Sequence, residues 1–244
     1  ALAYEQLTLA KRSKAPLSEF EAYTTMAVGS SMKSDYTASL GYLQMCLTTA
    51  QTLRDRKREA NTYSNLSNVY KNLGDLPQAL QQLERSLLID TELGNKEGLA
   101  GTFNNIGNIH TELGDLDKAL ENYQRSAALA EELDNKRGRA QALLNLGATH
   151  LELGALDTAL TEFEQSLELY RSMGRKLEMG MAFNNLGRVL ARLERIPEAF
   201  ASLDSAEQLL SAMGGMRQLA RTHVNRGNLF RQLGNARKAI AACE

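Results

Sequence analysis

Five asparagines recur at a constant spacing and are the residues in this sequence best suited to binding chemistry. They are Asn65, Asn105, Asn145, Asn185 and Asn225, about 40 residues apart. A side-chain amide carries both a hydrogen-bond acceptor and a donor, so it can satisfy the N–H and C=O groups of an extended backbone at one point. Each such bond contributes roughly 0.5–1.5 kcal/mol net. The column therefore predicts a surface that binds the main chain of another polypeptide.

The residues that would share a helix face with these asparagines are also mostly polar. Positions four before, three after and seven after a given residue lie along one side of a helix. We call this set of positions the stripe, and its candidate partner-binding residues are Asn65, Asn68, Asn105, Asn108, Asn145, Asn185, Arg188, Arg192, Arg221, Asn225 and Asn228. Large apolar residues are almost absent from it. A structural role, in which each amide bonds to a neighbouring helix or is simply solvated, fits the same pattern.

Charged residues divide the stripe into regions. Arg188, Arg192 and Arg221 belong to its C-terminal half, and Glu112 and Glu152 to its middle. A guanidinium can bind a carboxylate through two parallel hydrogen bonds, so the arginines predict a partner with an acidic residue or a C-terminal carboxylate. The alternative is that they are solvated and paired with nearby glutamates.

A repeated helical hairpin would position these residues. Small residues follow each asparagine by two places, and a column of alanines keeps the same period; the two sets are Ser67, Gly107, Gly147, Gly187 and Gly227, and Ala79, Ala119, Ala159, Ala199 and Ala239. Apolar residues within each unit fall at helical spacing, as two runs separated by a turn. Small residues at such positions let two helix backbones approach closely, so each unit is predicted to be a pair of packed helices.

Turn residues support the same boundaries. Gly74, Gly114, Gly154 and Gly234 end the predicted first helices, while Glu194 replaces glycine in the fourth, so that turn must close without the residue best suited to positive φ. Asp75 and Asp115 follow as N-caps, and Pro77 and Pro197 occupy the first turn of second helices, where a missing N–H is tolerated.

Two units carry a recognisable motif. It reads Leu66-Ser67-x-x-Tyr70, Gly74, Ala79 in one and Ile106-Gly107-x-x-His110, Gly114, Ala119, Tyr123 in the next. These residues resemble the tetratricopeptide repeat (TPR), in the longer form found in kinesin light chains, G-protein-signalling adaptors and bacterial relatives. The resemblance implies an all-α, right-handed superhelical solenoid of antiparallel helix pairs. It also implies that first helices line a concave groove in which the asparagines hold a peptide.

The repeat spacing predicts one solenoid over residues 1–244, with about five full repeats and partial helices at both ends. Residues 1–14 read as the second helix of a cut repeat and 17–56 as a degenerate repeat. Repeats follow at 57–95, 97–135, 137–175 and 177–215, with a truncated one at 217–244. Because the sequence begins with Ala1 in place of Met, we expect it to be a piece of a longer protein.

The composition of the chain limits the functions that it can have. Lys plus Arg number 28 and Asp plus Glu 29, a formal net charge of −1, so no global field attracts nucleic acid or an anionic membrane. No apolar run is long enough to cross a membrane. Cys46 and Cys243 have neither disulfide-framework nor metal-ligand spacing, which favours a reducing, cytoplasmic location and no metal site.

Catalytic signals are weak. His110 and His150 have no carboxylate or third ligand in their register, so we expect them to pack in the core, and His223 is isolated. No phosphate-binding loop, nucleophile elbow or zinc motif occurs, so no catalytic residue or cofactor is predicted. The first hypothesis is a non-enzymatic module that binds a peptide or segment of a partner protein. The alternatives are a regulatory or sensor domain that packs on its own effector in a larger signalling enzyme or transcription regulator, and self-association through the cut ends.

Overall fold

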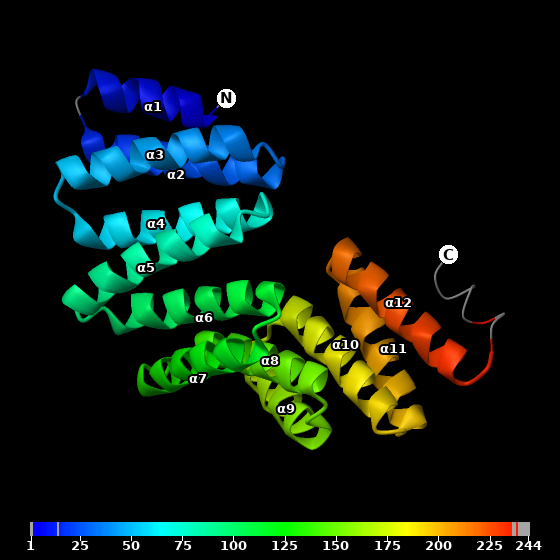
Figure 1. Cartoon of the computed structure of the whole chain (residues 1–244). Coiled ribbons are helices and arrows are strands. Elements are labelled where there is room, and N and C mark those ends of the chain that lie inside the picture. Colours follow the sequence, from blue (N-terminus) through cyan, green and yellow to red (C-terminus); the bar gives the residue numbers. More distant parts are fainter. Residues whose placement is uncertain (1, 14, 236–237, 239–244) are drawn as a thin grey trace. The chain divides into compact units, whose positions relative to one another are not determined.

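The computed structural model describes residues 2–13, 15–235 and 238, and the fold is all-α (Figure 1). Over these ranges the chain forms twelve helices and no strand. Ala239 and Cys243, both named above, lie outside the described residues. The chain divides into two compact units, Ala1–Asn122 and Tyr123–Glu244, and each is a set of helical hairpins. A single solenoid over residues 1–244 stays a prediction.

Unit 1 contains two complete hairpins between single helices. Its helices are α1 (Leu2–Arg12), α2 (Pro16–Met32), α3 (Tyr36–Thr52), α4 (Arg56–Asn72), α5 (Leu76–Glu92) and α6 (Lys96–Leu113), followed by α7 (Leu116–Glu132), in which the unit boundary falls. Helix α2 packs on α3 and α4 on α5, and the hairpins join through contacts of α3 with α4 and of α5 with α6. First helices α4 and α6 also touch, which brings their stripe positions side by side.

Unit 2 repeats this arrangement. Its helices after α7 are α8 (Lys136–Leu153), α9 (Leu156–Ser172), α10 (Lys176–Arg192), α11 (Ile196–Ala212) and α12 (Met216–Gln232). Helix α8 pairs with α9 and α10 with α11, while α10 lies between the first helices α8 and α12 and contacts both (Figure 1). The stripe residues of three successive hairpins are therefore neighbours within this unit.

The predicted caps and turns are confirmed. The Asp75 carboxylate accepts a hydrogen bond from the Gln78 backbone N–H at 3.1 Å, and Pro77 lies in the first turn of α5. Helix α6 ends at Gly114 in the left-handed conformation, with φ of 78°. At the turn where Glu194 replaces glycine, Glu194 itself adopts φ of 60°, so it occupies a conformation that L-residues disfavour.

The alanine and glycine columns lie at the helix crossings. Ala79, Ala119, Ala159 and Ala199 are all 0% exposed. A β-carbon added at Gly147 would lie 2.7 Å from Phe163 Cε1, and one added at Gly187 would lie 2.7 Å from Leu203 Cδ2. These columns thus allow the two helices of a hairpin to pack closely, as the small residues predict.

Candidate functional site

Helix α4 presents the open part of the stripe in unit 1. Asn65, Asn68 and Asn72 are exposed and line a cavity of about 210 Å³ between α4 and α2. The α2 side of this cavity is apolar, because Val28 and Met32 line it and are 53% and 83% exposed. On α6, Asn105 and Asn108 are half-buried. The cavity thus has one edge of amides and one apolar edge.

The apolar edge is a feature that sequence reasoning missed. Val28 occupies the stripe position of Asn68 one repeat earlier, and Met32 occupies that of Asn72. Reading residues 17–56 as degenerate concealed that two large apolar residues replace amides at exposed positions. Comparing each stripe column across all repeats could have found it.

A second cavity adjoins the first, since Thr24 lines both. It measures about 570 Å³, and its remaining lining is Phe20, Glu21, Thr25, Asp55, Lys57, Arg58 and Asn61. The Arg58 guanidinium lies 5.6 Å from the centroid of the Phe20 ring and forms an ion pair with Asp55. Hydrogen bonding from the Arg58 backbone N–H lowers the pKa of Asp55. The Arg58 guanidinium at this end of the surface is therefore already paired with a carboxylate.

In unit 2 the asparagines are more involved in the fold. Asn145 is half-buried and accepts a hydrogen bond from Gln141 Nε2 at 3.2 Å, while Gln141 Oε1 accepts one from the Tyr170 hydroxyl at 3.3 Å. Asn185 is only 9% exposed, and with Asn184 it lines a cavity of about 30 Å³, large enough for a single water. The amide column is therefore more open at Asn65 than at Asn185.

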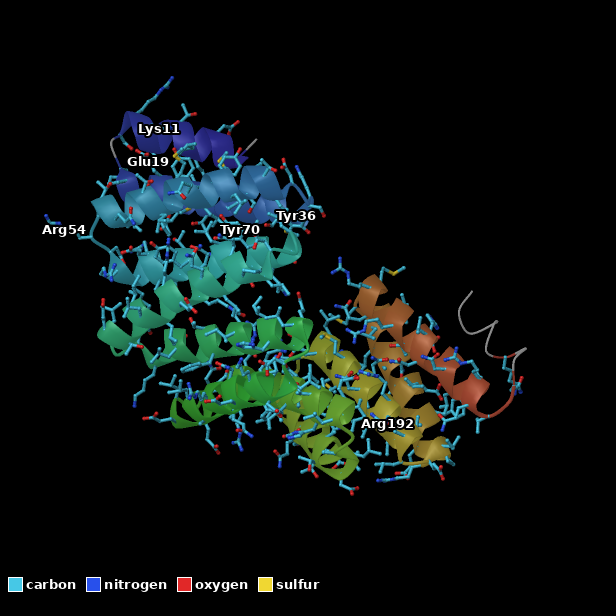
Figure 2. The ribbon with its side chains drawn as sticks, viewed as in Figure 1. Lys11, Glu19, Tyr36, Arg54, Tyr70 and Arg192 are labelled. Carbon is cyan, nitrogen blue, oxygen red and sulfur yellow. The ribbon has the colours of Figure 1, made fainter. Side chains whose placement is uncertain are left out.

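Two of the three predicted arginines have partners from the last turn of α8. Arg188 Nη2 lies 2.9 Å from Glu152 Oε1, and Arg192 donates a hydrogen bond to the Leu151 carbonyl oxygen. Arg192, labelled in Figure 2, is the last residue of α10. The carbonyls at a helix C-terminus have no partner within the helix and attract cations, so Arg192 acts as a cap on α8. The expected pairing with nearby glutamates is thus found at Arg188.

Arg221 differs from the other two arginines. It is exposed, and it has no ion pair or hydrogen bond to another side chain among the residues that the structure describes. It lines a cavity of about 560 Å³ whose other lining residues are Glu152, Arg188, Ala220, Val224, Asn225 and Asn228. Arg188, Asn225 and Asn228 also line an adjoining cavity of about 170 Å³ that extends to Arg192. Arg221 is therefore a cation available to a ligand.

Each of the two histidines has a nearby carboxylate that comes from outside its own helix and therefore does not share its register. His150 Nδ1 lies 2.7 Å from Oε2 of Glu162, on the second helix of the same hairpin. Burial raises the pKa of the Glu162 carboxyl, and its bond to His150 opposes this effect. His110 Nδ1 is buried without a hydrogen-bond partner, 4.0 Å from Asp115 Oδ2. Both pairs are half-buried within a hairpin, and over the described residues no group of three or more His, Cys, Asp and Glu could hold a metal.

Arg226 interrupts an apolar column, since Leu66, Ile106, Leu146 and Leu186 stand at its position in the other hairpins. Its Nη2 atom lies 2.7 Å from both Asp204 Oδ1 and Glu207 Oε2 on α11. Arg226 therefore joins α12 to α11 by charge where the other hairpins use hydrophobic packing. Its acidic partners were not predicted.

Comparisons with known proteins agree with this architecture. Tetratricopeptide repeat family models match residues 98–172 and 60–89. No curated protein sequence matches the chain. The solved structure of BtubC (BKLC) from P. vanneervenii has 24% sequence identity and a TM-score of 0.76, over 87% of this chain and 90% of that one.

Two further similar structures are complexes. A Rap protein with Competence and Sporulation Factor has 13% identity and a TM-score of 0.78, over 93% of this chain and 74% of its own. The Rap conjugation gene regulator of the plasmid pLS20 with the Phr* peptide has 14% identity and a TM-score of 0.75, over 95% and 64%. Identities this low establish a shared fold.

The packed hairpins and their mainly polar first-helix stripe define an α-helical repeat protein. More particularly, the chain is a tetratricopeptide repeat protein, and its motif columns, family matches and structural neighbours agree on this. Within the described ranges, none of the helices is both long and apolar enough to cross a membrane.

Proposed function

We propose that this protein is a non-enzymatic interaction module that binds a segment of a partner protein on the stripes of its first helices. The observation that carries the proposal is the cavity on α12 and its neighbours, where exposed Arg221 lies with Asn225 and Asn228. An amide side chain can hold the main chain of an extended segment. The guanidinium can hold an acidic side chain or a C-terminal carboxylate of the same segment.

The surface in unit 1 supports the same proposal with different chemistry. Asn65 and Asn68 offer donors and acceptors along one edge of the α2–α4 cavity, and Val28 and Met32 offer exposed apolar surface along the other. An extended segment directs alternate side chains to opposite sides. It can therefore place apolar side chains on α2 while its backbone bonds to α4.

The similar structures add an argument by analogy. One is a Rap regulator in complex with a peptide, and another is a Rap protein in complex with Competence and Sporulation Factor. TPR arrays generally act as interaction modules that perform no chemistry themselves. Because fold alone does not fix function, the proposal for this chain depends on its own amides and on Arg221. A regulatory domain that packs on its own effector would use the same surfaces for an intramolecular segment.

The test is a peptide array probed with the wild-type chain and with the double variant Arg221→Ala, Asn228→Ala. Both residues are exposed, so the fold should tolerate their removal. A hydrogen bond to a charged group contributes roughly 1.5–3 kcal/mol, so we expect affinity for the selected peptides to fall at least about tenfold. Arg217→Ala is the matched control, because Arg217 is exposed on the same helix and lines none of these cavities.

Equal binding by the double variant and the control, with unchanged circular dichroism and melting, would contradict the proposal for unit 2. The corresponding variant in unit 1 is Asn65→Ala, Asn68→Ala, which removes two exposed amides. The two units are tested separately in this way.

A further inference from the structure

Three charged side chains from three successive first helices line the cavity of about 560 Å³ in unit 2. Glu152 comes from α8, Arg188 from α10 and Arg221 from α12. Glu152 and Arg188 are paired at 2.9 Å, whereas Arg221 has no ion-pair partner among the described residues. The cavity therefore contains one guanidinium that is occupied by a carboxylate and one that is not.

The pair between Glu152 and Arg188 is weak enough to exchange. The Glu152 side chain is 56% exposed and that of Arg188 is 30% exposed. Exposed ion pairs contribute about 0–1 kcal/mol, since water screens them and both side chains lose freedom. An incoming carboxylate can therefore replace Glu152 at little cost, and the guanidinium gains the same type of hydrogen bond that it loses.

Arg192, the next arginine along α10, does not exchange its partner as readily as Arg188. Arg192 donates to the Leu151 carbonyl at the end of α8, and turning Arg192 toward a ligand would leave that helix-terminal carbonyl without its cap. Arg192 therefore remains attached to the fold while Arg188 can change partners. No other hairpin has a cation at the position equivalent to Arg188. The residues there are Val28, Asn68, Asn108, Ala148 and Asn228.

We infer that Glu152 is an internal competitor that lowers the affinity of this site for partner segments with two acidic residues, and so reduces its preference for them over segments with one. The inference rests on the function proposed above. A first carboxylate binds Arg221, and a second binds Arg188 in competition with Glu152, which accepts from its Nη2 atom. A segment with one acidic residue leaves the Glu152–Arg188 pair intact, and a neutral segment gains nothing from either arginine.

The test compares wild type with Glu152→Gln, which keeps the size and polarity of the side chain and removes its charge. Glu112→Gln is the matched control, because Glu112 stands at the same stripe position one repeat earlier and pairs with Lys71, at 3.6 Å, in unit 1. The probes are capped Gly-Ser dodecapeptides with no aspartate, with one, or with two aspartates separated by one to four residues. Nuclear magnetic resonance titrations of the whole chain give dissociation constants and follow the arginine side-chain N–H signals.

In wild type, the peptide with one aspartate is expected to shift the Arg221 signal and not that of Arg188. Glu152→Gln should strengthen binding of at least one peptide with two aspartates by roughly two- to fivefold, the range that an exposed ion pair represents. Its effect on the peptide with one aspartate should be much smaller, and Arg188 should then shift with the second aspartate.

Each contrary outcome has its own meaning. If Glu152→Gln strengthens the peptides with one and two aspartates equally, or no more than Glu112→Gln does, Glu152 acts only through net charge and the inference is wrong while the proposed function stands. If no acidic peptide shifts Arg221 in either protein, the carboxylate site itself fails, and the inference fails with it.

Discussion

Asn225 on α12 donates a hydrogen bond from Nδ2 to Oδ1 of Asn184 on α10, over 2.9 Å. Asn184 is 5% exposed, and the next residue, Asn185, is 9% exposed. Asn184 and Asn185 therefore lie within the packing of α10 against α12. Asn65 on α4 belongs to the same column as Asn185 and is exposed. Amides that are equivalent in the sequence thus divide between holding neighbouring hairpins together and facing outward.

This division predicts unequal effects of alanine on stability. Asn184→Ala removes a buried acceptor and leaves the Asn225 amide without its partner, so the free energy of unfolding should fall by about 1–2 kcal/mol. Asn65→Ala should change it by less than about 0.5 kcal/mol, because the side chain is exposed. Urea denaturation followed by circular dichroism measures both. If Asn184→Ala and Asn65→Ala lowered the free energy of unfolding by similar amounts, side-chain exposure would not distinguish asparagines that join hairpins from those that face outward.

Helix crossings give a second prediction. Gly147→Ala places a β-carbon 2.7 Å from Phe163 Cε1, inside normal contact distance, so stability should fall by about 1–3 kcal/mol. Gly101→Ala is the control, since a β-carbon there meets nothing within 4 Å and Gly101 lies inside α6. That change should stabilise by about 0.5–1 kcal/mol through the better helix propensity of alanine. A stabilising effect of Gly147→Ala would mean that α8 and α9 do not cross this closely.

The turn at Glu194 gives a third prediction. Its φ of 60° is disfavoured for L-residues, while Gly154 adopts φ of 82° at the equivalent turn one repeat earlier. Glu194→Gly should raise the free energy of unfolding by about 0.5–1 kcal/mol, since relief of the backbone strain exceeds the entropy that glycine adds to the unfolded chain. Glu194→Ala removes the same charge and keeps the β-carbon, so it should not stabilise. If Glu194→Gly and Glu194→Ala had equal melting temperatures, any gain in stability would come from loss of the negative charge and not from relief of backbone strain.

Screening of charge gives a fourth prediction, for peptides selected by the array. Affinity should fall as salt rises, because Arg221 is exposed and the attraction between exposed charges is screened over a Debye length of about 8 Å at 0.15 M ionic strength. The Arg221→Ala variant should bind more weakly and show a shallower salt dependence. Fluorescence polarisation from about 0.05 to 0.5 M sodium chloride measures this. Parallel salt curves for the two proteins would exclude Arg221 from the contact.

Local chemistry explains what could be predicted from sequence. The Asp75 cap, the position of Pro77 and the strained turn at Glu194 depend on residues a few places apart, so the sequence is sufficient to predict them. The partners of the stripe residues were harder to predict. Arg192 meets Leu151 and Asn225 meets Asn184 across 41 residues each, and both contacts depend on how one hairpin is rotated against the next.

The histidines illustrate the same limit within a hairpin. Stripe periodicity compares residues on one helix, whereas Glu162 approaches His150 from the second helix. A carboxylate on the facing helix therefore has no signature in the register of the histidine. The same applies to Asp204 and Glu207, which pair with Arg226 from α11.

A buried carboxyl in unit 1 gives the fifth prediction. Asp90 on α5 is 1% exposed, and its Oδ1 accepts a hydrogen bond from Asn95 Nδ2 at 2.7 Å. Ser86 Oγ lies 3.5 Å from Oδ2 and is itself bonded to the Ala60 carbonyl at 3.0 Å. Burial raises the pKa of Asp90 above its usual value, and the hydrogen bonds from Asn95, Ser86 and Thr102 and the charge of Lys57 only partly offset this.

The sign of the pH dependence follows from that direction. In the unfolded chain the carboxyl ionises near pH 4, whereas in the folded chain it ionises at higher pH. The stability associated with the neutral carboxyl is therefore complete below about pH 4 and is lost as pH rises through the folded pKa. In the variant Asp90→Asn, the new amide would keep the bond from Asn95 and could donate to Ser86 Oγ without ever carrying a charge. This substitution should therefore stabilise the protein by about 1 kcal/mol at pH 7 and very little at pH 4.

Urea denaturation of wild type and Asp90→Asn at intervals from about pH 4 to pH 7.5 measures the difference in unfolding free energy. Other carboxyl groups contribute to the pH dependence of both proteins, so the difference between them isolates Asp90. Asp117→Asn, at an exposed position on α7, controls for the loss of one negative charge and should give a difference that hardly varies with pH. If the Asp90→Asn difference is also constant over this pH range, Asp90 has the same ionisation in the folded and unfolded chain. Its burial between α5 and α6 would then place no penalty on the charged carboxylate.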